Sequence, residues 1–234
     1  MKNEILDIEN KDSDLIDTAP IVEMKNVHKS FDGHQVLKGI DLIVHKGENL
    51  VVLGKSGSGK SVLIKCIVGL VLPDEGEVCV FGRNISALKY KELNEVRVKV
   101  GFLFQSAALY DSMTVGENLA FPLKRHFKNL SAEETKKIID EGLDSVGLKE
   151  SIDVMPSELS GGMSKRIGLA RTLILKPEIM LYDEPTTGLD TITAKEISEL
   201  IVQMQKKNKI SSIIITHDLA CAKITSDRIE MLKG

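Results

Sequence analysis

The fold of this chain is decided by the stretch Gly54-Lys55-Ser56-Gly57-Ser58-Gly59-Lys60-Ser61. An apolar run at residues 50–53 precedes it and a helical pattern at residues 61–68 follows, so it fits G-x-x-x-x-G-K-[ST] in a strand–loop–helix context. The glycines let successive backbone N–H groups converge, and the helix N-terminus adds its positive end. Lys60 can then reach the β- and γ-phosphates, and Ser61 can ligate Mg²⁺. A turn that only starts a helix is the alternative. The complete motif and its flanks favour a nucleoside triphosphate site.

The composition is that of an ordinary globular protein. Its 234 residues allow one large domain or a domain with an inserted subdomain. The net charge of −3 argues against a nucleic-acid polyanion as the main partner. Cys66, Cys79 and Cys221 show no C-x-x-C spacing, which is typical of thiols packed as small apolar residues in a reducing cytosol. Because the sequence contains neither an apolar run of about 18 residues nor a signal-peptide core, we expect a cytoplasmic location.

The first 20 residues differ from the rest of the chain. They carry six acidic and two basic side chains, a local charge of −4, which leaves +1 for the remainder of a chain whose net charge is −3. We expect residues 1–20 to form a mobile acidic extension, with a regulatory or docking tail as the alternative. At the other end the chain stops at Gly234, where further elements are expected, so an abbreviated C-terminus is predicted.

Strand patterns follow the acidic segment. Alternating or apolar stretches predict strands, and Asp32-Gly33 between the first two is a hairpin signal. The predicted strands before residue 105 are residues 21–27, 36–44, 48–53, 77–81 and 100–104. We therefore expect an N-terminal antiparallel β-subdomain joined to the phosphate loop (residues 54–61).

The middle of the chain, approximately residues 106–158, has a helical pattern. One helical segment at residues 114–123 is expected to stop near Pro122, and a longer helix begins at Ser131, which forms a capping box with Glu134. The longer helix has one apolar face made by Ile138, Ile139, Leu143 and Val146. Because α/β patterns lie on both sides of this block, we interpret it as an inserted α-helical subdomain.

From Ser160 onward, strands and helices alternate again. Helices are predicted at residues 160–175 and 191–207, with a short one after His217. Strands are predicted at residues 179–182, 211–216 and 228–232. Continuous Val, Ile and Leu strands that alternate with helices are typical of a parallel sheet. The fold class is therefore α/β, with a mixed or parallel sheet at its core.

Two carboxylates stand at the end of the strand Ile179-Met180-Leu181-Tyr182-Asp183-Glu184. Ligands of open α/β sheets collect at the carboxyl edge, where the backbone turns and both side chains can reach one site. We assign Asp183 to the Mg²⁺ shell and Glu184 to general base catalysis, since phosphoryl transfer to water needs both roles. The alternative is a pair of solvated acids before a turn at Pro185.

The stretch Leu159-Ser160-Gly161-Gly162-Met163 supplies a second glycine-bearing helix start. Ser160 is a helix N-cap, and the glycines strip side chains from the first turn, which leaves a positive terminus suited to another phosphate. One nucleotide does not readily need two such termini from the same chain. We therefore hypothesise a composite site across a dimer; a flexible loop is the alternative.

Together these residues resemble the ATP-binding-cassette (ABC) family of transporter ATPases, from about Ile21 to the end of the chain. The matches are Phe31 for the aromatic that stacks on adenine, Gly54 to Ser61 for Walker A, Gln105 for the loop glutamine that senses Mg²⁺, Leu159 to Met163 for the signature, Ile179 to Asp183 for Walker B, Glu184 for the catalytic glutamate, Gly188-Leu189-Asp190 for the loop that crosses the dimer, and His217 for the switch histidine. The resemblance implies an ABC ATPase domain at residues 21–234. It further implies ATP hydrolysis with Mg²⁺ by a head-to-tail dimer, and a surface at residues 105–111 that receives a helix of a membrane permease.

One position departs from the family pattern, since Met163 stands where the signature usually ends in Gln. The serine hydroxyl and glycine amides that contact phosphate remain. Met163, residues 103–110 and residues 114–123 resemble one branch, the ATPase subunit of mammalian-cell-entry (MCE) lipid transporters. That resemblance implies phospholipid transport between two membranes, a multi-span permease and, indirectly, a periplasmic MCE-domain lipid-binding protein. The chain would then be peripheral on the inner face of the inner membrane.

Three other functions remain open from the sequence. A soluble ABC ATPase could remodel protein or nucleic-acid complexes, although a single cassette and near-neutral charge disfavour it. An ABC ATPase for a different imported or exported substrate is a second. A regulator that binds nucleotide without hydrolysis is a third, and intact Lys60, Asp183, Glu184 and His217 argue against it.

Overall fold

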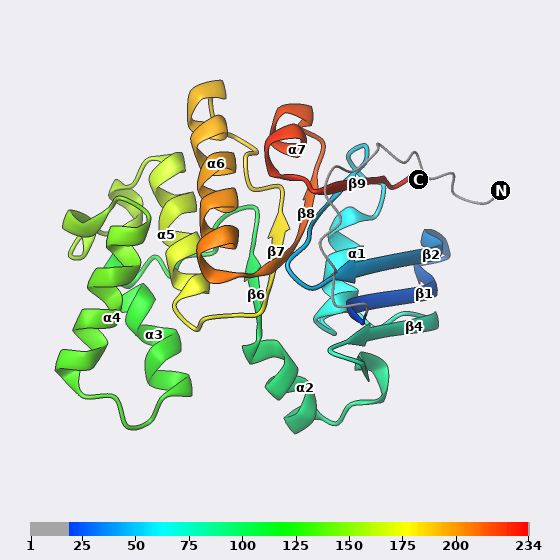
Figure 1. Cartoon of the computed structure of the whole chain (residues 1–234), viewed down its shortest axis with the longest axis horizontal. Coiled ribbons are helices and arrows are strands. Elements are labelled where there is room, and N and C mark those ends of the chain that lie inside the picture. Colours follow the sequence, from blue (N-terminus) through cyan, green and yellow to red (C-terminus); the bar gives the residue numbers. More distant parts are fainter. Residues whose placement is uncertain (1–18, 234) are drawn as a thin grey trace.

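The computed structural model describes residues 19–233, which form two sheets and the helices around them (Figure 1). Apart from Ala19 and Pro20, the expected mobile extension at residues 1–20 lies outside the described residues. One sheet has the strand order β2-β1-β4-β5 and the other has the order β6-β7-β8-β3-β9. Among residues 19–233, no helix combines the length and the apolar character needed to cross a bilayer.

The first sheet is antiparallel and confirms the expected hairpin. It consists of β1 (Pro20–Phe31), β2 (His34–His45), β4 (Glu75–Val80) and β5 (Arg83–Asn84). Asp32 and Gly33 connect β1 to β2 with φ of 48° and 80°. Two consecutive positive φ values give the two-residue turn that matches the twist of paired strands, which explains the Asp-Gly sequence.

The second sheet is parallel throughout, as the continuous apolar strands predict. It consists of β3 (Asn49–Leu53), β6 (Val100–Leu103), β7 (Ile179–Asp183), β8 (Ser211–Thr216) and β9 (Arg228–Met231). Every residue of β3, β7 and β8 is buried, because helices and the first sheet cover both faces.

The helices divide between two regions of the molecule (Figure 1). Their bounds are α1 (Lys60–Ile67), α2 (Tyr90–Val98), α3 (Val115–His126), α4 (Ala132–Ser145), α5 (Gly161–Leu173), α6 (Thr191–Asn208) and α7 (Leu219–Thr225). α1 lies beside the antiparallel sheet, whereas α3, α4 and α5 lie together on the other side of the parallel sheet. The sequence patterns missed α2, in which only Val96 is buried, so it has almost no apolar periodicity.

The predicted stop near Pro122 is wrong. α3 continues through Pro122 to His126, although an internal proline removes a backbone hydrogen bond at a cost of about 3 kcal/mol. Leu119 and Leu123, on either side of the proline, are fully buried in the helical core. Their packing holds the helix together across the proline. The predicted capping box is confirmed, because Ser131 and Glu134 accept each other's backbone N–H at 3.1 and 2.8 Å.

Two apolar clusters lie on opposite faces of the parallel sheet. Leu50 and Val52 of β3 belong to the cluster under the antiparallel sheet, and the intervening Val51 and Leu53 belong to the cluster under α3 to α6. Successive strand side chains point to opposite faces, so β3 contributes to both clusters. This packing fixes the carboxyl ends of β3, β7 and β8 at one edge of the sheet.

Candidate functional site

The phosphate loop connects the carboxyl end of β3 to α1, as the motif requires. Gly57 and Gly59 have φ of 79° and 97°, a region that glycine enters without strain. A Cβ atom on Gly59 would also lie 2.9 Å from Val36 Cγ1, so the β2 strand leaves room only for glycine. The loop thereby places Lys60 and Ser61 in the first turn of α1.

A pocket of about 440 Å³ opens over this loop. Its lining includes several residues that the sequence assigned to the site, namely Ser56, Gly57, Gly59, Lys60, Ser61, Gln105, Glu184 and His217. These residues come from four separate segments of the chain, and the sheet edge brings them together. The volume falls within the range of about 300–1,000 Å³ typical of small-molecule sites.

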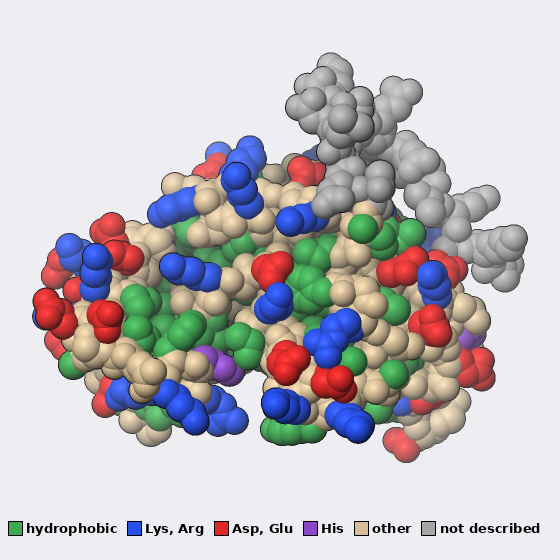
Figure 2. All heavy atoms as spheres, turned by 60° about the horizontal axis from the view of Figure 1, so that its bottom comes forward, with side chains coloured by type: hydrophobic (Ala, Val, Ile, Leu, Met, Phe, Trp, Pro, Cys, Tyr) green, Lys and Arg blue, Asp and Glu red, His purple; other side chains and the backbone are tan. Residues whose placement is uncertain are grey.

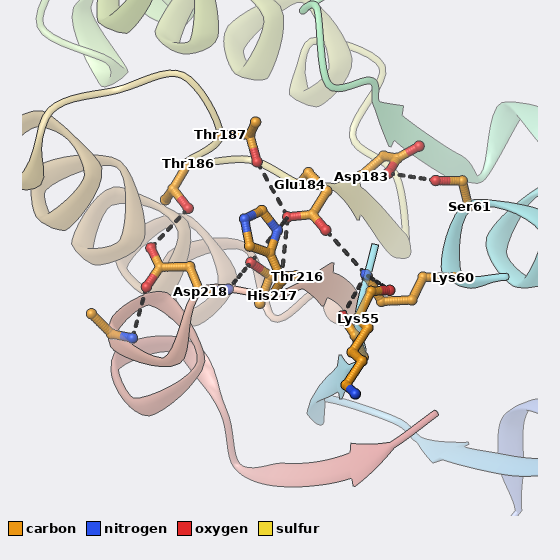
Figure 3. Close-up of polar contacts among 12 residues, drawn as sticks. Lys55, Lys60, Ser61, Asp183, Glu184, Thr186, Thr187, Thr216, His217 and Asp218 are labelled. Atoms are coloured by element: carbon orange, nitrogen blue, oxygen red, sulfur yellow. Dashed lines mark hydrogen bonds and ion pairs between the residues drawn. The ribbon is translucent and has the colours of Figure 1, made fainter. Parts of the chain in front are cut away.

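Ser61 and Asp183 provide adjacent oxygen atoms at the base of the site (Figure 3). The Ser61 hydroxyl donates to Asp183 Oδ1 at 3.0 Å. Burial raises the pKa of Asp183, and the Ser61 hydrogen bond opposes that rise. A hydroxyl and a carboxylate are the hard ligands that Mg²⁺ accepts, and an ion that binds substrate phosphates needs only one or two protein carboxylates. The donor set fits Mg²⁺.

Glu184 is the most densely contacted side chain of the site (Figure 3). Its Oε2 accepts from His217 Nδ1 at 2.8 Å, Thr187 Oγ1 at 3.2 Å and Thr216 Oγ1 at 3.3 Å. Its Oε1 lies 3.3 Å from Lys60 Nζ. The carboxylate is therefore held between a lysine of α1 and a histidine at the end of β8.

These contacts set the ionisation of Glu184. Burial by itself raises the pKa of the carboxyl, but the hydrogen bond and charge of His217 and the charge of Lys60 together lower it below its ordinary value. Glu184 is accordingly ionised and able to accept a hydrogen bond from a water molecule. His217 stays accessible, because 58% of its side chain is exposed and it lines the pocket.

The loop after β6 carries Gln105 to the same pocket. Lys165 Nζ donates to the Gln105 carbonyl oxygen at 2.5 Å, so the loop is tied to α5. The two residues Ala107 and Ala108 have φ of 60° and 50°, in the left-handed region that non-glycine residues seldom enter. This loop is therefore held in place by contacts outside itself.

Ser160 N-caps α5, as predicted, by accepting from the Met163 backbone N–H at 3.2 Å. Neither Ser160 nor the glycines after it appear among the residues that line the pocket over the phosphate loop. A Cβ atom on Gly162 would lie 2.5 Å from Thr193 Cγ2, so close packing against α6 requires this glycine. Gly161, by contrast, is exposed.

Six further predicted residues also lie outside the lining of this pocket, namely Phe31, Gly54, Lys55, Ser58, Asp183 and Asp190. Asp190 caps α6, with Oδ1 accepting from the backbone of Ile192 and Thr193 at 3.0 and 3.1 Å. Phe31 ends β1, is 43% exposed, and lies under Lys29 Nζ, which is 5.3 Å from the ring centroid. Asp190 and Phe31 both have contacts within the chain that account for their positions.

Sequence reasoning missed the two threonines that hold Glu184. Thr187 follows Glu184 by three residues, and Thr216 is the last residue of β8, directly before His217. The sequence does place one threonine close to Glu184 and another directly before His217, and this proximity could have indicated that their hydroxyls contact the carboxylate. Val36 and Val62 also line the pocket, and nothing in their local sequence indicates it.

Comparison with known proteins now places the chain. The model of the ABC transporter family matches residues 37–187. The chain is 40% identical over 90% of its length to the probable ribonucleotide transport ATP-binding protein Mkl of Mycobacterium leprae, covering 60% of that protein. It is 38% identical to protein trigalactosyldiacylglycerol 3 of Arabidopsis thaliana, with 92% of this chain and 67% of that protein covered. Against the methionine import ATP-binding protein MetN of Brucella abortus, identity is 37%, covering 92% of this chain and 58% of the other.

Solved structures agree with these relatives. The dimeric ATP-binding cassette MJ0796 in a post-hydrolysis state with ADP and phosphate has a TM-score of 0.83 and 34% identity, covering 91% of this chain and 94% of that one. The chain spans about three fifths of the length of the mycobacterial relative. The chain belongs to the ABC transporter family and is one of its ATP-binding domains, the class of domain that hydrolyses ATP.

Proposed function

We propose that this chain is the ATP-hydrolysing subunit of a membrane transporter for lipids, and that the contact of Glu184 with Lys60 and His217 is the centre of its catalytic site. Glu184 acts as general base, and Lys60 and His217 stabilise the charge that develops on the γ-phosphate. The observation that carries this proposal is the Glu184 carboxylate, which is held on one side by His217 at 2.8 Å and on the other by Lys60 at 3.3 Å.

Lys60 has to exchange partners when ATP binds. Its ammonium now donates to the carbonyl oxygens of Gly54 and Lys55 at 2.7 and 3.1 Å and pairs with Glu184 Oε1. Phosphate oxygens are strong acceptors for a lysine ammonium, so Lys60 turns from Glu184 to the β- and γ-phosphates. Oε1 of Glu184 is then free to accept a hydrogen bond from water.

Hydrolysis follows from that arrangement. The oxygen of the water molecule bonds to the γ-phosphorus, and the bond from phosphorus to the β–γ bridging oxygen breaks with its electron pair left on ADP. Glu184 takes the proton of the attacking water, while Oε2 stays fixed by Thr187, Thr216 and His217.

Ser61 and Asp183 would hold Mg²⁺, with Gln105 from the same side of the pocket. An ion held by these residues would neutralise negative charge on the phosphates of ATP. The remaining phosphate contacts come from the amides of the phosphate loop, from Gly54, Lys55, Ser56, Gly57, Ser58 and Gly59. Phe31 would stack on the adenine.

A second copy of the chain would complete each site. Ser160 and Gly161 are exposed at the N-terminus of α5, and neither they nor the buried Gly162 line the pocket over the chain's own phosphate loop. Asp190 lies beside this terminus, because it caps α6 through Thr193, which packs against Gly162. A head-to-tail dimer would bring this terminus to the γ-phosphate of the partner's nucleotide. The related cassette MJ0796, which is dimeric, supports this arrangement.

The membrane partner is proposed to be a multi-span permease that binds at residues 105–111 and at the helical block of residues 106–158, which we treat as a subdomain inserted into the ABC domain of residues 21–234. Tyr110 and Phe121 are exposed aromatic side chains here, with ring centroids 5.0 Å apart, and they offer an apolar surface for a permease helix. The chain would then be peripheral on the cytoplasmic side of the inner membrane.

Lipid is the proposed substrate. Support comes from the resemblance of Met163, residues 103–110 and residues 114–123 to the MCE branch. A relative whose name contains a galactolipid also supports it. Other relatives are named for ribonucleotide transport and methionine import, so a different small molecule is the second candidate. A periplasmic MCE-domain protein would be the indirect partner of a lipid system. Nucleic acid is a poor fit, since basic and acidic side chains are interspersed on the face in Figure 2.

The catalytic assignment is tested with Glu184→Gln. Glutamine keeps the shape but cannot take a proton, so kcat should fall at least about 100-fold while ATP still binds and traps the dimer. Glu178→Gln is the matched control, because Glu178 stands just before β7 and pairs with Lys99 on the surface. Rapid turnover by Glu184→Gln would remove the general base from the proposal.

The transport assignment is tested by purification of the chain from membranes with a tag. A multi-span membrane protein should co-purify, and the ATPase rate of that complex in vesicles should respond to phospholipid. Stimulation by methionine or a ribonucleotide instead would replace the substrate. Co-purification of a ribosome or DNA without a membrane protein would favour a soluble remodelling ATPase.

A further inference from the structure

Lys165 is a buried ammonium to which the reaction described above gives no role. It lies on α5, is 6% exposed, and donates to the carbonyl oxygens of Gln105 at 2.5 Å and Glu184 at 3.3 Å. One side chain therefore joins three segments: the helix that starts at Ser160, the loop after β6, and the turn after β7.

The placement of this charge is costly. Burial lowers the pKa of Lys165, and the nearby carboxylates of Asp183 and Glu184 partly offset that effect. No ion pair among residues 19–233 includes Lys165, so its ammonium depends on the two backbone carbonyls. Burial of a cation without a paired carboxylate has a large desolvation cost, and such residues are retained where their contacts serve function.

Two more residues on the same face of α5 hold the loop after Gln105. Arg171 donates to the carbonyl oxygens of Ala107 and Ala108 at 3.0 and 2.8 Å. Gly168 lies between Lys165 and Arg171, and a Cβ atom there would be 2.9 Å from Ala107 Cβ. The spacing of three residues puts all of them on one side of the helix.

The two segments whose carbonyl oxygens accept from Lys165 both contain strained backbone. Glu184 has a φ of 50°, and Ala107 and Ala108 have φ of 60° and 50°. Left-handed conformations of residues with a side chain persist only where the surroundings hold them. Lys165 holds the carbonyl of Glu184 itself, and with Gly168 and Arg171 it holds the loop.

We propose that Lys165 is a positioning residue that fastens α5 to the Gln105 loop and to the backbone of Glu184, so that the three move as one body when the dimer closes. The inference rests on the proposed roles of Glu184 and Ser160. Ser160 is the N-cap of α5. When the partner's nucleotide binds at Ser160 and displaces α5, the Gln105 loop and Glu184 therefore move with the helix. Docking of a permease at the loop is thereby linked to the catalytic acid.

The test is Lys165→Met, which removes the ammonium and keeps the apolar stem. In the full chain, with its membrane subunits where turnover requires them, kcat should fall by about 10- to 100-fold, because the two hydrogen bonds that the charged ammonium donates are both lost. KM for ATP should change by less than about threefold, because Lys165 does not touch the phosphate loop. Lys165→Arg, which keeps the charge and N–H donors, should recover at least about a third of the wild-type kcat.

Hydrogen exchange provides a second readout that does not depend on turnover. Amides of residues 105–110 should exchange faster in Lys165→Met, while those of β8 keep their protection. Arg166→Met is the matched control, since Arg166 is adjacent on α5 but contacts Glu196 and Val146 instead of the loop. Its kcat and the exchange of residues 105–110 should stay within about twofold of the wild type.

A kcat within threefold of the wild type in Lys165→Met, with Glu184→Gln inactive in the same assay, would overturn the inference and leave the proposed function intact. An active Glu184→Gln would instead remove the catalytic assignment. If Lys165→Met does not fold, Gly168→Ala replaces it, because the added Cβ must push Ala107 and its loop away. An unchanged kcat in Gly168→Ala would also overturn the inference.

Discussion

Two helices of this molecule begin with glycines and a polar residue, yet their surroundings differ. The N-terminus of α1 faces Glu184 and His217 of its own chain across one pocket. The N-terminus of α5 at Ser160 lines no part of that pocket. A helix N-terminus can bind an anion, and among the described residues the terminus of α1 faces the side chains to which we assign catalysis, whereas the terminus of α5 does not line that pocket.

The glycines also serve different purposes at the two termini. Gly59 needs both its positive φ of 97° and the space beside Val36, so it shapes the loop. Gly162 has an ordinary helical conformation and is required only because Thr193 of α6 leaves no room. A glycine motif can therefore shape a binding loop in one place and permit close helix packing in another.

The largest expected effect comes from mixing two inactive variants, which tests whether the termini of α1 and α5 act on the same nucleotide across a dimer. Lys60→Ala removes the phosphate lysine and Ser160→Arg blocks the α5 terminus, and each variant alone should lose at least about 100-fold in kcat. In a head-to-tail dimer, a mixed pair contains one site with both changes and one intact site. Mixing equal amounts should recover up to about a quarter of the wild-type rate, measured by phosphate release. No recovery would mean that one chain forms the whole site.

Alanine substitutions at Gly161 and Gly162 test the packing role of Gly162 through the free energy of unfolding. Gly162→Ala should lower the free energy of unfolding by about 1–2 kcal/mol, since its Cβ would overlap Thr193, whereas Gly161→Ala, 3.3 Å from Leu189 Cδ2, should change it by less than about 0.5 kcal/mol. Urea unfolding measures both. Thr193→Ser removes the methyl and should rescue Gly162→Ala; equal effects of the two alanines would refute the packing explanation.

The smallest expected effect belongs to Met163. Ser160 already caps the Met163 backbone N–H, so the side chain at this position is not needed for the helix start. Met163→Gln should therefore keep the ATPase rate within about tenfold of the wild type. A steady-state ATPase assay is sufficient, and a collapse in rate would mean that the thioether itself contacts a partner or nucleotide.

Local patterns predicted most strands and helices, and they failed where packing overrides propensity. Pro122 stands inside α3 because Leu119 and Leu123 are buried on either side of it. α2 escaped detection because only Val96 of its residues is buried. Such elements depend on neighbours distant in sequence, and no window of local residues contains that information.

From local sequence patterns alone we could predict the phosphate loop, the two carboxylates at the carboxyl end of β7 and the parallel character of the core. Only the tertiary structure decided what surrounds Glu184. Lys60, Lys165 and the adjacent pair Thr216 and His217 come from three separate segments, and the edge of the parallel sheet brings them to Glu184. Thr187 contacts Glu184 from the same turn. The physical reason is that a loop's chemistry is set by its own backbone, whereas the ionisation and position of a buried acid are set by every element packed around it.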